Sequence, residues 1–334
     1  MALTWIAKKI RAYGTLVMFR HTIFSLSFGL ISLLLATDGR LFFGKFFLIL
    51  AALLSARTGA NSINRVIDAE IDAKNPRTAN RQLPTGQMQK KEALAFSVVC
   101  FLLMGFFVFF INSLCLFLLP VAVFFLWLYS YTKRFTWTCH FFLGFTCALA
   151  PLGAWLAVTG SFGGLLPFLE KLWDGWLLAW QGYPVLGLRL AGSSVFIVQG
   201  IFLSKDPIFI PLFLGLANGC WVAGFDIIYG AQDVAFDRAN GIHSLPARFG
   251  IKQALRISTG LHIFAVGCLL MVGLFSQRLG FVYFLGIAIV ALLLFIEHAI
   301  VNPDGLKRAQ IAAYSLNEIV GLVFLGFTLV AVYI

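Results

Sequence analysis

The chain has 334 residues, of which 60% are hydrophobic and only 12% are charged. Soluble domains carry about 25% charged residues, so this composition excludes an ordinary soluble domain and predicts a protein embedded in a lipid bilayer. The net charge of +11 does not indicate a nucleic-acid partner, because the Lys and Arg residues lie in short segments between apolar runs.

These apolar runs are long enough to cross a membrane, and they predict an all-α fold with nine transmembrane helices. In chain order the predicted spans are 16–36, 42–66, 94–112, 114–132, 138–158, 208–230, 257–275, 279–300 and 312–333. Residues 1–11 precede the first span, and their pattern is typical of a short basic amphipathic helix lying on the membrane surface.

The distribution of basic residues predicts the orientation in the membrane. With nine spans, most of the 25 Lys and Arg residues fall in the N-terminal segment and in loops on the same side. Cytoplasmic loops carry an excess of Lys and Arg. We therefore expect a protein of the plasma (inner) membrane whose N-terminus and long loops 73–92 and 238–252 are cytoplasmic.

Residues 161–207 interrupt the regular pattern of spans. They include Trp173, Trp176 and Trp180, whose spacing suits an amphipathic helix at the level of the lipid headgroups. We expect an atypical extracytoplasmic insertion within a single membrane-embedded domain that covers residues 1–334. A pair of further spans inside this segment is the alternative.

Two groups of aspartates stand at the cytoplasmic ends of apolar segments. Asp68 and Asp72 follow Asn64, and Asp233 and Asp237 follow Asp226 and Tyr229. At 100° per residue, each group would lie along one face of a helix. Carboxylates at a membrane edge are costly and mark functional sites. Mg²⁺ binds through one or two carboxylates together with substrate phosphates, so we predict that Asp68, Asp72, Asp233 and Asp237 bind Mg²⁺ and a phosphorylated ligand.

Basic residues accompany both groups on the same side of the predicted membrane. We expect Arg77, Arg81, Lys133 and Arg134 to bind phosphate oxygens. Arg20 and Arg57 lie within predicted spans, where an Arg needs a partner, and we expect each to bind either a phosphate oxygen or a substrate carboxylate. Asn317 is placed mid-span, and it either bonds another helix or reaches the cavity. The histidines His140, His262 and His298 are expected to be structural.

The chain resembles the UbiA superfamily of intramembrane prenyltransferases. The resemblance rests on three motifs: Asn64-x3-Asp68-x3-Asp72 followed by Arg77 and Arg81, then Tyr129-Ser-Tyr-Thr-Lys133-Arg134, then Asp226-x2-Tyr229-x3-Asp233-x3-Asp237. It covers nearly the whole chain except 161–207, a segment that most members lack. Within the superfamily, the segment from Asp233 to Gly250 is similar to the 4-hydroxybenzoate polyprenyltransferase-like branch.

The resemblance implies nine helices around a central cavity and an Mg²⁺-dependent enzyme. It implies transfer of a polyprenyl group from polyprenyl diphosphate to an aromatic acid, here 4-hydroxybenzoate, in quinone biosynthesis. Prenylation of a dihydroxynaphthoate on the way to menaquinone is an alternative, and homogentisate or haem are further acceptors of the same enzyme class. The alternative of another class is an ion-coupled membrane transporter, although transporters bind substrate near the middle of the bilayer.

Overall fold

A computed structural model describes residues 12–17, 22–40, 42–162, 209–276, 278–301, 306, 309 and 315–334. The long helices are α2 (Thr22–Ala36), α3 (Phe43–Lys74), α4 (Lys90–Phe109), α5 (Ser113–Thr132), α6 (Cys139–Thr159), α9 (Phe209–Gly230), α12 (Ile251–Phe275), α13 (Phe281–Ile300) and α14 (Asn317–Tyr333). Short elements follow α9: the 3-10 turn η2 (Ala231–Asp233), α10 (Val234–Ala239) and α11 (Leu245–Phe249). No strand occurs among these residues.

Each predicted span overlaps one of the long helices. In the described part of the chain, seven helical stretches are long and apolar enough to cross a membrane, and two shorter apolar helices, Leu26–Ala36 and Asn317–Tyr333, accompany them. The all-α membrane class is therefore confirmed. The predicted surface helix over residues 1–11 and, apart from its first two residues, the predicted insertion at 161–207 lie outside the described residues.

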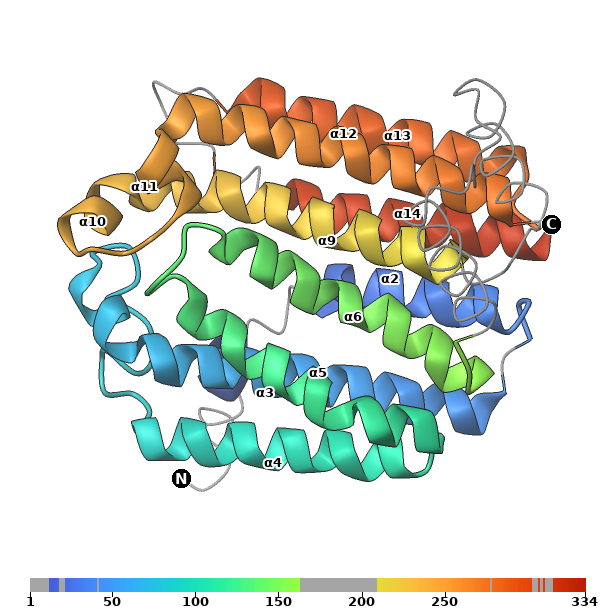
Figure 1. Cartoon of the computed structure of the whole chain (residues 1–334), viewed down its shortest axis with the longest axis horizontal. Coiled ribbons are helices and arrows are strands. Elements are labelled where there is room, and N and C mark those ends of the chain that lie inside the picture. Colours follow the sequence, from blue (N-terminus) through green and yellow to red (C-terminus); the bar gives the residue numbers. More distant parts are fainter. Residues whose placement is uncertain are drawn as a thin grey trace, which may run out of the picture.

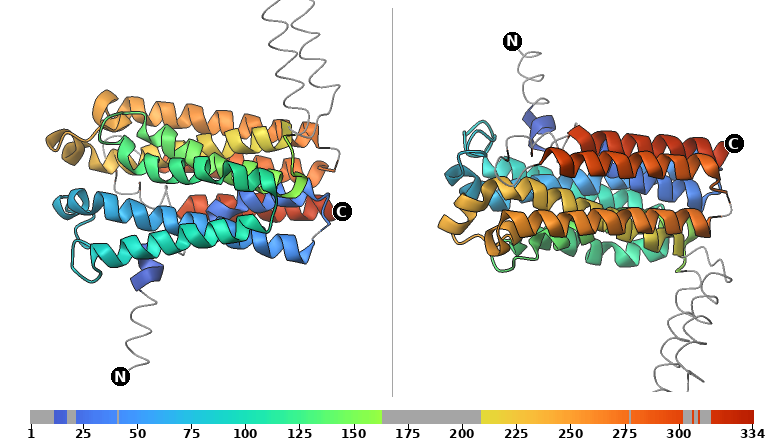
Figure 2. Two further views of the ribbon diagram at one scale, coloured as in Figure 1. Left: turned by 60° about the horizontal axis from the view of Figure 1, so that its bottom comes forward. Right: turned by 90° about the horizontal axis from the view of Figure 1, so that it is seen from above.

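The long helices run side by side along one axis (Figures 1 and 2). Neighbours in sequence pack together from α3 to α6, and α9, α12, α13 and α14 form the second half of the bundle. α6 packs along α9, and α2 packs against both α6 and α14, so the two halves are joined. The short elements α10 and α11 and the connection after α3 lie together at one end, which we call the polar end (Figure 1).

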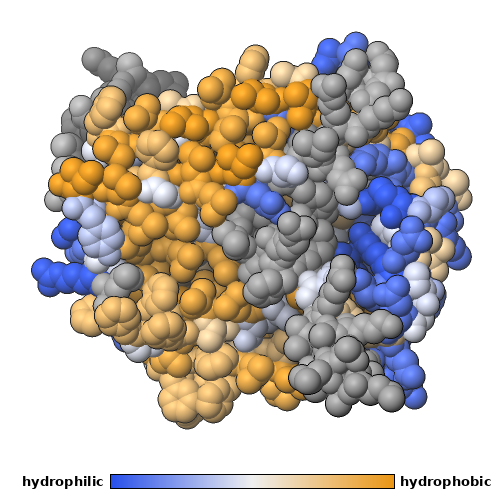
Figure 3. All heavy atoms as spheres, turned by 180° about the vertical axis from the view of Figure 1, so that it is seen from behind, coloured by the Kyte–Doolittle hydropathy of each residue, from blue (hydrophilic) through white to orange (hydrophobic). Residues whose placement is uncertain are grey.

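Exposed apolar side chains cover the flanks of the bundle, as expected for contact with lipid. Phe117 and Phe281 are 78% and 79% exposed. Exposing such large apolar side chains to water would be unfavourable in free energy. A broad hydrophobic surface spans the middle of the molecule, whereas hydrophilic residues gather at the polar end (Figure 3).

Local sequence explains where the helices at the polar end stop. α3 extends beyond the predicted span to Lys74, and Asn75 adopts an extended conformation because Pro76 disfavours a helical residue before it. The expectation of one continuous helix from 226 to 237 is wrong: α9 ends at Gly230, the chain makes a 3-10 turn, and α10 begins at Val234. Asp226 and Asp237 therefore lie on two different helices, although both line the same cavity.

Two glycines allow α6 and α9 to approach closely. A Cβ atom on Gly144 would lie 2.3 Å from the carbonyl oxygen of Gly219, and a Cβ on Gly219 would lie 3.2 Å from the carbonyl oxygen of Gly144. Small residues at such crossings let helix backbones pack against one another within a bilayer.

We expect the Gly144→Ala variant to be destabilised by about 1–3 kcal/mol, because its methyl group overlaps backbone that has no rotamer to move away. Gly153→Ala is the matched control, since it lies on the same helix and its Cβ would meet no atom within 4 Å. Alanine favours helix over glycine, so the control should unfold at the same or a higher temperature. Equal thermal unfolding temperatures for the two purified variants would contradict the close packing.

Candidate active site

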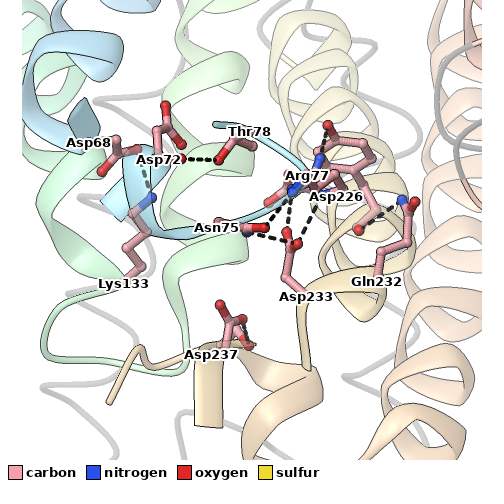
Figure 4. A network of polar contacts seen from close by, with 12 residues as sticks. Asp68, Asp72, Asn75, Arg77, Thr78, Lys133, Asp226, Gln232, Asp233 and Asp237 are labelled. Atoms are coloured by element: carbon pink, nitrogen blue, oxygen red, sulfur yellow. Dashed lines mark hydrogen bonds and ion pairs between the residues drawn. The ribbon is translucent and has the colours of Figure 1, made fainter. Parts of the chain in front are cut away.

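A cavity of about 300 Å³ opens at the polar end between the two halves of the bundle. α3, α5 and α6 supply one side of its wall, and α9, η2 and α10 supply the other. The predicted site residues that line it are Arg57, Asn64, Asp68, Asp72, Arg77, Arg81, Lys133, Asp226, Tyr229, Asp233 and Asp237. The two aspartate groups are thus brought to one cavity, as the sequence predicted (Figure 4).

Asp68 and Asp72 present their carboxylates from the last turns of α3. Lys133 Nζ donates to Asp68 Oδ2 at 2.7 Å, and the amide of Asn64 donates to the same oxygen at 3.0 Å. One nitrogen of Arg81, Nη1, lies 2.8 Å from each carboxylate oxygen of Asp72. Both aspartates are buried, so these charged contacts are shielded from bulk water and the carboxylates are held in fixed positions.

Asp233 faces α3 from the other side of the cavity. Arg77 donates from Nε to Asp233 Oδ1 at 2.8 Å and makes a further short contact through Nη2, while Asn75 donates to Oδ1 at 3.0 Å. The Arg77 guanidinium also stacks on the ring of Tyr229, 4.3 Å from its centroid. Burial alone would lower the pKa of Arg77, but the hydrogen bond with Asp233 and the charge of its partners raise that pKa. Arg77 is therefore a permanent cation between the two aspartate groups (Figure 4).

Asp237 is held by the cap of the next helix. Ser244 is the N-cap of α11, where its hydroxyl oxygen accepts from the backbone N–H of Ala247 at 3.2 Å. The same hydroxyl donates to Asp237 Oδ2 at 2.6 Å. Because a hydroxyl can both donate and accept, one serine starts a helix and orients a carboxylate of the site.

The residues present suit hard divalent cations that are shared with a phosphorylated ligand. Among the described residues, no three His, Cys, Asp or Glu side chains converge to hold a metal by themselves. However, Asp68 Oδ1 is buried in the cavity wall and has no hydrogen-bond partner within the described part of the chain, and a buried carboxylate oxygen without a partner is costly. Mg²⁺ favours oxygen ligands and completes its shell with phosphate and water, so this donor set fits it.

A second cavity, about 230 Å³ in volume and lined almost entirely by apolar side chains, adjoins the first. It runs between α3, α4, α5 and α6 away from the polar end. Arg57, Asn61, Tyr129, Leu143 and Cys147 line both cavities. These shared residues define a junction where a charged head group and an apolar chain of one ligand would meet.

The sequence profile of the UbiA prenyltransferase family matches residues 25–325. This chain belongs to the UbiA prenyltransferase family. The transporter alternative consequently has no support, and the predicted family resemblance is confirmed.

Several UbiA-family proteins are similar to this chain. A 4-hydroxybenzoate octaprenyltransferase from Shewanella pealeana is 26% identical over 84% of the chain and 79% of its own length. A protoheme IX farnesyltransferase from Cytophaga hutchinsonii is 31% identical over 55% of the chain and 68% of its own length. The solved structure of a UbiA homologue from Aeropyrum pernix K1 has a TM-score of 0.73, with 27% identity over 94% of this chain and 98% of that one.

A UbiA homologue from Archaeoglobus fulgidus, solved bound to GPP and Mg²⁺, has a TM-score of 0.61. It is 17% identical over 97% of this chain and 100% of its own, so the likeness shows the shared fold. That protein combines a prenyl diphosphate with Mg²⁺ in the same UbiA architecture.

Two of the predicted site residues that the structure describes, Arg134 and Asn317, are not brought to the cavity of this UbiA-family protein. Arg134 donates to the backbone carbonyl of Ile67 at 2.6 Å and lines a neighbouring cavity instead. Asn317 is fully buried elsewhere, where it accepts from the Trp221 indole and donates to Glu297 at 2.8 Å. Arg20 lies outside the described residues.

Sequence reasoning also missed residues that the fold places at the site. His140 was expected to be structural, yet it lines the cavity and contacts Asp226. Asn75 and Ser244 hold Asp233 and Asp237. The Ser-x-Pro pattern that begins α11 was a signal for a capping serine, whereas nothing in the sequence showed which carboxylate the cap would touch.

Proposed function

We propose that this protein transfers a polyprenyl group from polyprenyl diphosphate to a hydroxylated aromatic acid, with 4-hydroxybenzoate as the preferred acceptor in quinone biosynthesis. The observation that carries the proposal is the junction of two cavities, one with two groups of aspartates and the other apolar. A prenyl diphosphate has the same division between a charged head and an apolar chain. We further propose that the protein lies in the plasma (inner) membrane with its polar end facing the cytoplasm.

The diphosphate would lie between the aspartate groups. Asp68, Asp72, Asp233 and Asp237 would hold Mg²⁺, and the bound metal would supply positive charge that stabilises diphosphate as a leaving group. Lys133, Arg77 and Arg81 already line this part of the cavity and would donate to phosphate oxygens. Arg134 contacts the backbone of α3, so we propose that it fixes the loop that carries Lys133.

The apolar cavity would hold the prenyl chain and exclude water from the allylic cation. Water excluded from a reactive intermediate cannot capture it, so the aromatic ring becomes the accepting nucleophile. The side chains that line this cavity, which include Ile49 on α3 and Ala157 on α6, are mostly apolar. On the outside of the bundle, α3, α4 and α5 also expose apolar side chains. A chain that extends beyond this cavity would therefore remain in an apolar environment.

The position of Arg57 favours an acceptor that carries a carboxylate. Its side chain lines both cavities, so a ring bound at the junction would lie near a guanidinium that pairs well with a carboxylate. Dihydroxynaphthoate, the alternative acceptor, carries the same carboxylate. The relatives named as protoheme IX farnesyltransferases favour a porphyrin as a further candidate, but a polar cavity of about 300 Å³ suits a one-ring or two-ring acid better.

Product identification tests the proposal directly. Purified protein with Mg²⁺ and octaprenyl diphosphate would be incubated separately with 4-hydroxybenzoate, a dihydroxynaphthoate and haem, and the products identified by mass. We expect a prenylated aromatic acid that disappears when Mg²⁺ is chelated. Prenylation of haem alone would refute the aromatic-acid acceptor while leaving the enzyme class intact.

The Arg57→Gln variant should discriminate between the two substrates. Loss of a charged hydrogen bond to a carboxylate costs about 1.5–3 kcal/mol, so we expect the KM for the aromatic acid to rise about 10-fold to 100-fold. The KM for the prenyl diphosphate should change little, because its head group lies among the aspartates. Steady-state kinetics with each substrate varied in turn would measure both values, and an equal rise in both would contradict the assignment.

A further inference from the structure

His140 and Asp226 form a buried pair in the wall of the active-site cavity. His140 lies in the first turn of α6 and Asp226 in the last turns of α9. The close packing of these helices brings His140 Nδ1 to 2.6 Å from Asp226 Oδ2. An ionised carboxylate only accepts hydrogen bonds, so Nδ1 of the imidazole donates.

The two members of the pair differ in their access to the cavity. The Asp226 side chain is 27% exposed and the His140 side chain only 6%, although both line the cavity. Asp226 therefore lies in front, where a ligand would touch it, and His140 lies behind. The arrangement is that of a carboxylate whose orientation is set by a second residue that is less accessible from the cavity.

The position of His140 is costly, which argues for a role beyond packing. Its Nε2 is buried and has no hydrogen-bond partner among the described residues. The ring also depends on a glycine at the end of α9: a Cβ on Gly230 would lie 3.0 Å from His140 Cε1. A buried polar atom without a partner is uncommon in native proteins, and a catalytic role is one of the reasons for which it is retained.

We propose that Asp226 accepts the proton that the aromatic acceptor loses and that His140 is the positioning residue that makes this possible. This inference rests on the proposed function, since it requires a ring that is alkylated at carbon. It adds to that function a division of the cavity, in which Asp68, Asp72, Asp233 and Asp237 serve the diphosphate and Asp226 serves the acceptor.

The allylic C–O bond breaks and its electron pair leaves with the diphosphate, and a ring carbon forms the new bond to the prenyl carbon. The proton on that ring carbon passes to the cavity-facing oxygen of Asp226, and the C–H electron pair restores the aromatic ring. The other oxygen of Asp226 keeps the hydrogen bond from His140 Nδ1, which holds the carboxylate in one orientation throughout.

The test compares four variants of the full-length protein in detergent: His140→Asn, His140→Phe, Asp226→Asn and the double variant His140→Phe with Asp226→Asn. With 4-hydroxybenzoate varied at saturating octaprenyl diphosphate, we expect His140→Phe and Asp226→Asn each to lower kcat/KM for the acceptor about tenfold or more. The KM for octaprenyl diphosphate should stay within about twofold. His140→Asn should retain about a third or more of the activity, because its amide N–H can replace Nδ1–H.

Coupling between the residues distinguishes positioning from an unrelated structural effect. If His140 acts through Asp226, the double variant should be no slower than Asp226→Asn alone. The proposal is overturned if the two losses multiply, if His140→Asn is as impaired as His140→Phe, or if the KM for octaprenyl diphosphate rises equally. A failure of the proposed function differs from all of these, since the unmutated protein would then form no prenylated aromatic acid, and this outcome would also overturn the role of the pair.

Discussion

The Asp68→Asn variant is expected to lose prenyl transfer by about 100-fold or more. Asparagine keeps the size and one oxygen of aspartate but removes the negative charge that would attract Mg²⁺. It also leaves Lys133, which lies 2.7 Å from the carboxylate, opposite a neutral partner. Groups that stabilise charge developing in the transition state contribute losses of this size when a single member is removed. The measurement is turnover of labelled polyprenyl diphosphate in membranes at several Mg²⁺ concentrations.

Asp38→Asn is the matched control for this experiment. Asp38 is 71% exposed and lies 3.4 Å from Arg278, in the α2–α3 connection at the end opposite the site. The substitution removes the same charge from the same kind of side chain, so a general effect of charge on expression or insertion would appear in both variants. Turnover near the unmutated rate in Asp68→Asn would refute the metal-binding role, and loss in Asp38→Asn would show that the assay responds to something else.

Filling the apolar cavity should change which donor the protein accepts. Gly153 lines this cavity, and a Cβ at this position would meet no atom within 4 Å. The Cβ of a phenylalanine therefore has open space at this position, and its ring would occupy space that we assign to the prenyl chain. We expect Gly153→Phe to lower kcat/KM about tenfold or more for octaprenyl diphosphate and to leave dimethylallyl diphosphate nearly unaffected.

Gly267→Phe provides the comparison for the cavity-filling variant. Gly267 also has open space at its Cβ, but it is exposed on α12 and does not line the cavity. Both variants add the same apolar ring to a membrane helix, so only Gly153→Phe should change the ratio of long-chain to short-chain turnover. An unchanged ratio in Gly153→Phe would exclude this cavity as the site of the chain.

Sequence patterns predicted the helices and the gathering of the aspartates because those features have local causes. Apolar runs of membrane-spanning length must be helical, and the excess of basic residues on one side placed both aspartate groups at the same end. The 3-10 turn after Gly230 could not be predicted, because the sequence from Asp226 to Asp237 keeps a helical spacing of its polar residues. Asp233 lies in this turn and accepts from Arg77, a contact that depends on tertiary packing.

Long-range partners explain the remaining differences. His140 and Asp226 are 86 residues apart, and their contact follows from the crossing of α6 and α9, which a single sequence does not reveal. Asn317 satisfies its amide within a buried group of side chains on other helices, the first of its two predicted outcomes. In both cases the type of residue was informative, but only the packing of the helices decided its neighbours.

The contact between Arg77 and Asp233 has a consequence for how this protein would tolerate change. Its members come from opposite halves of the bundle, 156 residues apart, so the candidate active site lies between the halves and neither half can form it alone. A substitution that weakens the packing between the two halves would shift Arg77 and Asp233 relative to each other, while the individual helices stay inserted in the membrane. Catalysis should therefore be lost before the fold is, and evolutionary drift should be slowest along that boundary.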